Sequence, residues 1–280
     1  MVLRFGLNVI NAYSPGFILE LAESAEKAGW EGFFLWDHIL FPWPAPLADP
    51  WVVLGAIAAK TRRIRIGTAV TPLPRRRPHK VARETATLDV ITGGRAVLGV
   101  GLGGDEGEFT RFGEEASTRA RAEKLDEALE LITALWSGRE VNHRGVHYEA
   151  SGVTFLPKPI QEPRIPIWVG GVSGAALRRA RKWDGWLPVG PASAGGFPGT
   201  TIQELPEMIR YINGDRMGSP AEIVYTMDVP EAGEKRRSDL ALLEGMGVDW
   251  VLDHIYGLRY SQEQAIDWVS KGPPNMASSV

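Results

Sequence analysis

Residues 63–104 read RIRIGTAVTPLPRRRPHKVARETATLDVITGGRAVLGVGLGG, and this run contains one complete strand–helix–strand unit. The stretches RIRIGTAV (63–70) and RAVLGVGL (95–102) are short, rich in β-branched residues and largely apolar, as strands covered on both faces are. Between them, Pro78 suits the first turn of a helix and Gly93-Gly94 suits its end. The run therefore predicts two parallel strands joined by a crossover helix.

The same alternation of strand and helix continues along the 280 residues of the chain. The helical segments are amphipathic, the clearest covers about 117–137, and the last begins with a capping-type Ser261. Eight such pairs predict an α/β fold of the (β/α)8 TIM-barrel type. The six further strands predicted are LRFGLNVI (3–10), GFFLW (32–36), IPIWVGG (165–171), GWLPVG (185–190), EIVYTMDV (222–229) and DWVLDHI (249–255).

We expect one domain over residues 1–275 and a polar tail at 276–280. A doubly wound open sheet is the alternative fold, but it normally has fewer strands, and the glycine-rich runs lack an acidic ribose partner at dinucleotide-site spacing. The segment EVNHRGVHYEASGVTF (140–155) alternates around a turn and predicts a small hairpin inserted before the fifth barrel strand. The run ASAGGFPGT (192–200) is predicted as a loop.

The composition is that of an ordinary globular protein, with 44% hydrophobic and 23% charged residues. The net charge of −3 gives no basic field for nucleic acid, and no run approaches the roughly 18 apolar residues of a membrane span. The sequence has no cysteine, which excludes disulfides and thiolate chemistry, and it shows no ligand spacing typical of a metal site. The first residues do not resemble a secretory signal, so we expect a cytoplasmic protein.

Catalytic candidates lie at the carboxyl ends of the predicted strands, where the loops of a TIM barrel converge on the active site. The second strand ends in Asp37-His38 inside the otherwise apolar run FLWDHILFPW (34–43), and a histidine there suits proton transfer near neutral pH. Packing alone is the alternative for this pair. The turns GVGLGG (99–104) and VGGVSGAAL (169–177) would let backbone N–H groups approach a phosphate or a planar ring, although tight turns also explain them.

Other residues near strand ends are weaker candidates. Aromatic residues around His38 either wall a flat pocket or belong to the core. These aromatic residues are Trp36, Phe41 and Trp43. The acids Asp105, Glu106 and Glu108 after the fourth strand are candidate proton donors or a solvated edge.

The remaining candidates are charged or titratable residues. The arginine cluster Arg75, Arg76 and Arg77 is predicted as a solvated loop, and the hairpin residues His143 and His147 are expected to face solvent. The pair Asp253-His254 ends the eighth strand.

Several motifs together resemble the bacterial luciferase-like family of flavin- and deazaflavin-dependent oxidoreductases. They are WDHILFPW (36–43), the run from 61 to 104, RAEKLDEALELITALWSG (121–138), VTFLPKPIQEPRIPIWVGG (153–171) and LRRARKWDGWLP (177–188). The resemblance implies a TIM barrel that holds reduced FMN or the deazaflavin coenzyme F420 at its carboxyl-terminal mouth. It also implies a bulge with a non-prolyl cis peptide at Ala69-Val70 beneath the ring, Gly101 and Gly103 beside it, and a phosphate loop at Gly170, Gly171 and Val172.

The Asp-His pair resembles the motif of the deazaflavin-dependent members, in which the histidine lies near the reactive carbon and a tryptophan follows. The resemblance implies a catalytic set of Asp37, His38 and Trp43, with Trp43 one residue further from His38 than in the sugar-phosphate dehydrogenases of the family. The catalytic glutamate of those dehydrogenases falls on Gly104 here, which argues against the sugar-phosphate reaction. The pair favours F420, and FMN stays open.

The resemblance predicts an oxidoreductase or monooxygenase that acts on a small organic molecule, with His38 moving a proton and Asp37 positioning it. A flavin-binding protein of the same fold without turnover is one alternative. A cofactor-free barrel lyase or isomerase is another, and it would need a lysine or a metal site at a strand end. The family often forms dimers, so a homodimer is compatible with the sequence.

Overall fold

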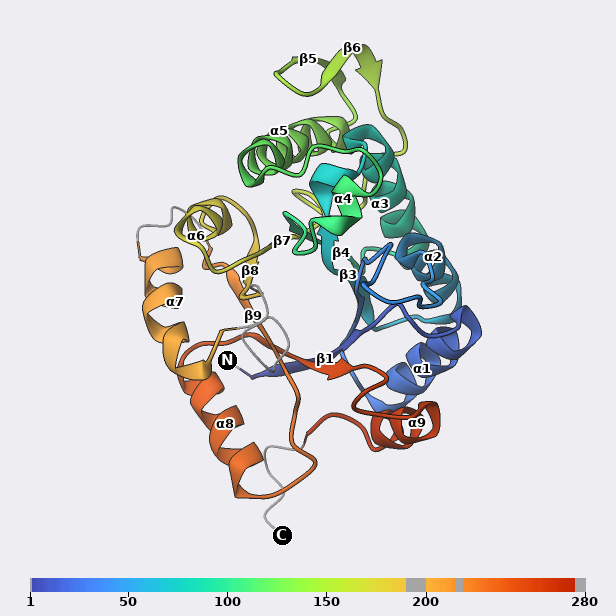
Figure 1. The fold of residues 1–280 in the computed structure, drawn as a ribbon, viewed down its shortest axis with the longest axis vertical. Coiled ribbons are helices and arrows are strands. Elements are labelled where there is room, and N and C mark those ends of the chain that lie inside the picture. The colour runs from blue at the N-terminus through green and yellow to red at the C-terminus, as the bar shows by residue number, and fades with distance from the viewer. Residues whose placement is uncertain (1, 190–199, 215–218, 275–280) are drawn as a thin grey trace.

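Eight parallel strands close into a barrel in the computed structural model, which describes residues 2–189, 200–214 and 219–274 (Figure 1). Around the barrel the strands follow the order β1-β10-β9-β8-β7-β4-β3-β2, and β5 and β6 form a separate antiparallel pair. The barrel strands are β1 (Arg4–Val9), β2 (Gly32–Leu35), β3 (Arg65–Pro72), β4 (Ala96–Gly101), β7 (Ile167–Gly170), β8 (Gly185–Leu187), β9 (Glu222–Met227) and β10 (Trp250–Ile255); the pair is β5 (Glu140–Arg144) and β6 (Glu149–Thr154).

Helices follow the barrel strands and form an outer ring (Figure 1). In the described part of the chain they are α1 (Pro15–Ala28), α2 (Pro50–Lys60), α3 (Pro78–Thr92), α4 (Gly107–Thr110), α5 (Thr118–Trp136), α6 (Gly174–Ala180), α7 (Leu205–Asn213), α8 (Glu234–Gly245) and α9 (Gln262–Ser270), with 3-10 turns at η1 (Leu73–Arg75) and η2 (Ile202–Glu204). None of these helices is long and apolar enough to cross a membrane.

The predicted helix ends are confirmed by their capping geometry. The Ser261 side chain accepts a hydrogen bond from the Gln264 backbone N–H, and the Gln264 side chain accepts one from the Ser261 N–H in return. Helix α3 starts at Pro78 and ends at Gly93, whose φ of 68° is the left-handed conformation that glycine adopts without a Cβ clash. Helix α5 begins after Ser117, so the segment predicted at 117–137 is a helix with nearly those bounds.

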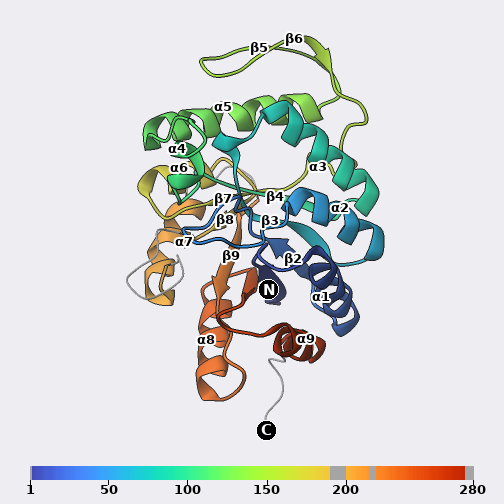
Figure 2. The same cartoon turned by 45° about the vertical axis from the view of Figure 1, so that its right-hand side comes forward.

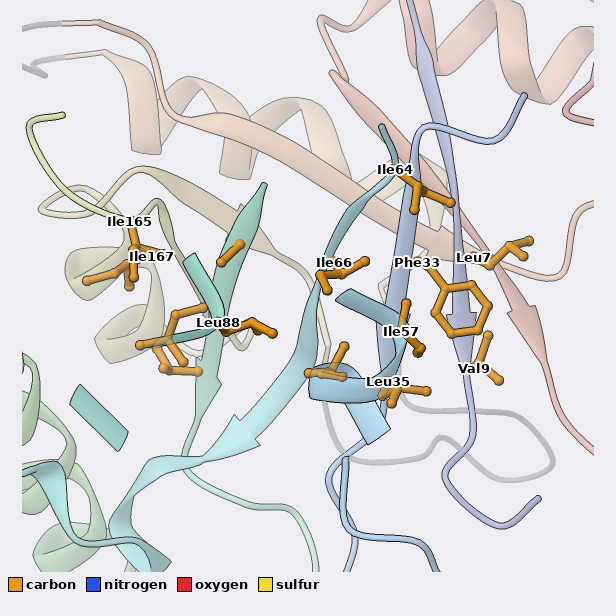
Figure 3. Close-up of a cluster of buried hydrophobic side chains, with 14 of the residues drawn as sticks. Leu7, Val9, Phe33, Leu35, Ile57, Ile64, Ile66, Leu88, Ile165 and Ile167 are labelled. Carbon is orange, nitrogen blue, oxygen red and sulfur yellow. The ribbon is translucent and has the colours of Figure 1, made fainter. Parts of the chain in front are cut away.

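Two hydrophobic clusters lie on opposite faces of the barrel wall, because successive residues of a strand point to opposite sides. The outer cluster fills the space between strands and helices, as the side chains of Leu7, Phe33 and Ile66 show in Figure 3. The inner cluster fills the lumen, where the rings of Phe34, Trp168 and Trp250 pack against one another with centroids 4.9–6.2 Å apart. The lumen is therefore a packed core below the level of the mouth.

The TIM barrel and the hairpin insertion are confirmed, and the doubly wound open sheet is wrong. The hairpin lies on the outer side of α5, away from the barrel (Figure 2). The sixth barrel strand is shorter than predicted and ends at Leu187. Residue 190 at its predicted end, residues 192–199 of the predicted loop and the predicted tail at 276–280 lie outside the described residues.

Candidate active site

A cavity of about 520 Å³ lies at the carboxyl ends of the barrel strands. Of the residues that the family resemblance assigns to catalysis or cofactor binding, all except Trp43 line this cavity. Its described lining residues come from every barrel strand but β9, or from the loops and short helices that follow those strands. They are Asn8; Trp36, Asp37 and His38; Ala69, Val70 and Pro72; Gly101, Leu102, Gly103, Gly104 and Glu108; Gly170, Gly171, Val172, Ser173, Ala176 and Arg179; Val189; and His254.

One wall of the cavity is built by the end of β3 and the glycines beside it. The peptide bond between Ala69 and Val70 is cis, as expected, and the register between β3 and β4 shifts between Thr68 and Thr71. A Cβ added to Gly101 would lie 2.8 Å from Val70 Cγ2, and one added to Gly170 would lie 3.1 Å from Val70 Cγ1. The glycines therefore leave the space that the Val70 side chain fills. This part of the wall consists of small, apolar residues without long side chains.

The loop after β7 forms the next part of the wall. Gly171 has a φ of 130°, and a Cβ there would lie 2.7 Å from the Cβ of Ala176, so both conformation and space require glycine. The Trp186 indole N–H donates to the Gly171 carbonyl oxygen at 2.8 Å. The buried Arg179 guanidinium donates from Nε and Nη2 to the two oxygens of Asp126 at 2.5 and 2.7 Å. This end of the cavity thus has a fixed backbone and a cation that already has a carboxylate partner.

Asp37 lies at the end of β2, and its side chain is fully buried. Its oxygens accept hydrogen bonds from Arg75 Nη2 at 2.9 Å, Arg76 Nη2 at 2.8 Å and Thr71 Oγ1 at 2.9 Å. Burial alone would raise the pKa of Asp37, but the two guanidinium groups outweigh it and lower that pKa. The prediction of a solvated arginine loop is therefore wrong for Arg75 and Arg76, which hold the strand end through Asp37.

His38 is not positioned by Asp37, which corrects the prediction. Its Nδ1 lies 3.3 Å from Oε1 of Glu108, a side chain with no solvent exposure. Burial would raise the pKa of Glu108, but the hydrogen bond from His38 and the charge of Arg75 lower it, so the carboxylate is ionised and accepts from Nδ1–H. Asn11 holds the His38 backbone, donating from Nδ2 to the carbonyl oxygen at 2.7 Å.

Arg75 joins the two buried carboxylates of this network. Its Nη1 donates to Glu108 Oε2 and its Nη2 to Asp37 Oδ1, both at 2.9 Å. Glu108 also accepts the backbone N–H groups of Ile39 and Leu40 at 2.7 and 3.2 Å. The expectation of a solvated acidic edge is therefore wrong for Glu108, while Glu106 is 70% exposed. The sequence contained no local signal for this role, because the partners of Glu108 lie 33 and about 70 residues away.

A further part of the wall is formed by Asn8 on β1, Trp36 after β2 and His254 on β10. Asn8 is 2% exposed, and in the described part of the chain its Oδ1 has no hydrogen-bond partner. His254 Nδ1 lies 3.2 Å from Oδ1 of Asp228, and its ring meets the Trp36 ring edge-on at 6.2 Å. Burial raises the pKa of the neighbouring Asp253, which Arg259 and the Trp268 indole bind on the outer side of the barrel. The neighbouring residues Asp253 and His254 therefore lie in different environments, His254 at the cavity and Asp253 on the outer side of the barrel.

Three further predicted residues lie away from the cavity lining. Trp43 is 59% exposed and stacks on Phe41, with centroids 5.3 Å apart and an interplanar angle of 12°. The hairpin histidines are only partly exposed, which corrects the expectation that they face solvent. His143 lies 3.2 Å from Glu127, and His147 lies 3.4 Å from Glu123.

The profile of a family described as luciferase-like monooxygenase matches residues 5–210. An F420-dependent glucose-6-phosphate dehydrogenase from Microbacterium testaceum is 39% identical over 185 residues, which are 64% of this chain and 54% of that protein. An uncharacterized protein from Mycobacterium tuberculosis is 31% identical over 231 residues, which are 76% of this chain and 77% of that protein. The chain spans between 52% and 61% of the length of four such F420-dependent dehydrogenases.

Solved structures share the fold at lower sequence identity. The monooxygenase RslO1 from Streptomyces bottropensis superposes with a TM-score of 0.80 at 21% identity, covering 95% of this chain and 96% of its own. The coenzyme F420-dependent tetrahydromethanopterin reductase from Methanopyrus kandleri gives 0.76 at 18% identity, covering 97% and 98%. The profile covers well over half of the chain, and the closed eight-stranded barrel is the fold of the solved structures just named. The chain therefore belongs to the luciferase-like monooxygenase family.

Proposed function

We propose that this chain is an oxidoreductase that binds reduced F420 or reduced FMN in the cavity and reacts it with a small organic substrate, with F420 favoured. The observation that carries the proposal is the apolar wall at the carboxyl end of the barrel, formed by Ala69, Val70, Gly101 and Gly170, in a cavity that the imidazole of His38 also lines. The names of the F420-dependent relatives support the choice of F420.

The residues present fit a planar tricyclic ring with a phosphate-bearing side chain. A Cβ added to Gly104 would meet no atom within 4 Å, so the loop after β4 leaves open space beside the wall. The second end of the cavity, at Gly171 and Ser173, offers backbone without intervening side chains and has the Arg179 guanidinium close by. We place the ring against Val70 and the phosphate near Gly171.

His38 would act as the proton-transfer group. Because ionised Glu108 accepts from Nδ1–H, Nε2 is the nitrogen that can take or give a proton in the cavity. Glu108 and Arg75 fix the tautomer and the ring orientation, as a carboxylate does for a catalytic histidine. The cofactor itself would supply the hydride or, in the case of FMN, the reaction with dioxygen.

Binding of the cofactor is the first test. We expect F420 to bind the apo protein at micromolar concentration, followed by deazaflavin fluorescence, and FMN to bind more weakly by flavin fluorescence. Failure of both to bind would overturn the proposal. Binding of either without oxidation of its reduced form by any acceptor would instead identify a non-catalytic flavin-binding protein.

A matched pair of glycine variants links binding to the wall itself. In Gly101→Ala the added methyl lies too close to Val70 and pushes it into the cavity, so we expect cofactor affinity to fall about tenfold or more. In Gly16→Ala the added methyl meets no atom within 4 Å, and affinity should be unchanged. Equal affinities in the two variants would contradict the placement of the ring.

A further inference from the structure

We propose that Asn8 is the polar substrate contact of this cavity, and that the subsite around it takes the hydroxyl or carbonyl group of an uncharged, mainly apolar substrate. This inference rests on the proposed function, because it concerns the molecule that would react with the cofactor. It assigns a role to the wall formed by Asn8, Trp36 and His254, which the cofactor placement does not use.

The strongest observation is a buried amide oxygen without a hydrogen-bond partner among the described residues. Asn8 lies between the apolar residues Leu7 and Val9 near the end of β1, and it is 2% exposed. It lines the cavity, and its Oδ1 has no hydrogen-bond partner in the described part of the chain. Buried polar atoms are nearly always hydrogen-bonded, because leaving one unpaired destabilises the folded state. An amide kept in that condition beside a cavity points to a ligand group that completes it.

The position of Asn8 suits a substrate rather than the cofactor wall. In the barrel register Asn8 on β1 pairs with His254 on β10 and with Phe34 on β2, so its side chain belongs to a part of the wall two strands away from Val70 on β3. A substrate lying between these two parts of the wall would have its polar group toward Asn8 and its reacting carbon toward the ring. His38, at the rim after β2, would be within reach of the same polar group.

The charges around the cavity disfavour an anionic substrate. Among the described lining residues Arg179 is the one guanidinium group; it is paired with Asp126 and lies at the glycine end. The ionised Glu108 also lines the cavity. A phosphate ester buried here would lack an uncompensated cation, which costs far more than burying a neutral hydroxyl.

An amide serves both forms of such a substrate. Its N–H group donates to a carbonyl oxygen and its oxygen accepts from a hydroxyl, so one side chain can bind an alcohol and the ketone derived from it. Oxidation of the alcohol breaks the C–H bond with transfer of hydride to the oxidised cofactor, moves the hydroxyl proton to His38 Nε2 and forms the C=O bond. Reduction of the ketone runs through the same transfers in reverse.

The test uses the cofactor-loaded protein with cyclohexanol, 2-butanol and cyclohexanone as uncharged probes and glucose 6-phosphate as the charged probe. We expect the uncharged probes to be turned over and glucose 6-phosphate to be inert. In Asn8→Leu, which keeps the size of the side chain, KM for the uncharged probes should rise about tenfold while the Kd of the cofactor stays within about threefold. The apo variant should melt about 2 °C higher, because an unpaired buried amide has been removed.

Thr226→Val is the matched control, since Thr226 Oγ1 is also buried without a partner in the described residues but does not line the cavity. It should leave KM unchanged. A lower melting temperature of Asn8→Leu with unchanged KM would show a structural role and overturn the proposal, as would saturable turnover of glucose 6-phosphate in preference to the uncharged probes. The proposal would also be overturned if no uncharged probe bound or was turned over at millimolar concentration. Cofactor binding that persists in these cases would leave the proposed function intact.

Discussion

Glu222 at the amino-terminal end of the barrel lumen and Asn8 at the carboxyl-terminal end differ in whether their side-chain oxygens have hydrogen-bond partners. At the amino-terminal end, Glu222 accepts hydrogen bonds from Arg4 at 2.7 Å, from the Trp168 indole at 2.9 Å and from the Trp250 indole at 3.4 Å. At the carboxyl-terminal end, Asn8 Oδ1 has no partner in the described part of the chain, although Asn8 is better shielded from water than Glu222. Both ends belong to the same strands and lie on either side of the same aromatic core.

The difference separates groups that stabilise the fold from groups that await a ligand. A carboxylate whose lone pairs are occupied by protein donors has no capacity left for chemistry, whereas an unpaired amide next to a cavity lowers stability until something binds to it. An unpaired group of this kind is of interest where it also lines a cavity, because functional sites are where local rules of polar pairing are expected to be broken. Substitutions at the two ends of the lumen test whether one end mainly affects stability and the other mainly affects function.

The largest effect is expected from the cavity end. His38→Ala removes the proposed proton-transfer group and should lower turnover by about 10²–10⁴-fold, with cofactor affinity within several-fold of the unsubstituted protein. Steady-state kinetics and a cofactor titration measure the two quantities. His143→Ala, which removes an imidazole paired with Glu127 on the hairpin, is the control and should retain full turnover. Unchanged turnover in His38→Ala would remove His38 from the mechanism.

The amino-terminal end should respond in stability alone. Glu222→Leu leaves Arg4 without its carboxylate and the Trp168 N–H without an acceptor, so we expect a loss of about 2 kcal/mol, moderated because the Glu222 side chain is about a quarter exposed. Urea unfolding measures this loss. Glu20→Leu, an exposed position on α1, should change stability little. A large drop in cofactor affinity without a loss of stability would contradict the division between the two ends.

The smallest effect concerns Glu108, which belongs to the cavity end but is fully paired. Its folded-state pKa lies below the ordinary value of 4.5, so the unfolded chain binds more protons and stability decreases as the pH falls through and below that value. Glu108→Gln should therefore be less stable than the unsubstituted protein above about pH 5, with a gap that narrows on acidification. Urea unfolding at several pH values tests this, and a gap that stays constant or widens in acid would contradict it.

The sequence predicted the barrel well because strand and helix signals are local. Apolar runs such as RIRIGTAV, the proline at the start of α3 and the glycine at its end each determine structure within a few residues. Cavity-lining glycines were also predictable, since strand ends of a TIM barrel converge and glycine marks close approach. The assignment of these elements therefore needed no knowledge of the tertiary contacts.

The partners of the polar residues were not predictable in this way. Asp37 and His38 are neighbours in the chain, yet adjacent side chains at a strand end point in different directions, so each meets a different partner. In the sequence Glu108 resembles one of three solvated acids, because its partners Arg75 and His38 belong to other loops. Asn8 was visible as a lone amide in LRFGLNVI, but only the packed barrel shows that its oxygen has no donor among the described residues.

Gly104 is a position on the cavity wall where a side chain could be added without a steric clash, unlike Gly99 on the strand before it. A Cβ at Gly99 would lie 2.0 Å from the Thr68 carbonyl oxygen, so a side chain there would require a different backbone. At Gly104 a Cβ would meet no atom, and its φ is not in the left-handed region, so any side chain could be added without moving the barrel. The glutamate that the family resemblance implies at this position in the sugar-phosphate dehydrogenases could therefore be introduced here by one substitution, without displacing the backbone of the barrel.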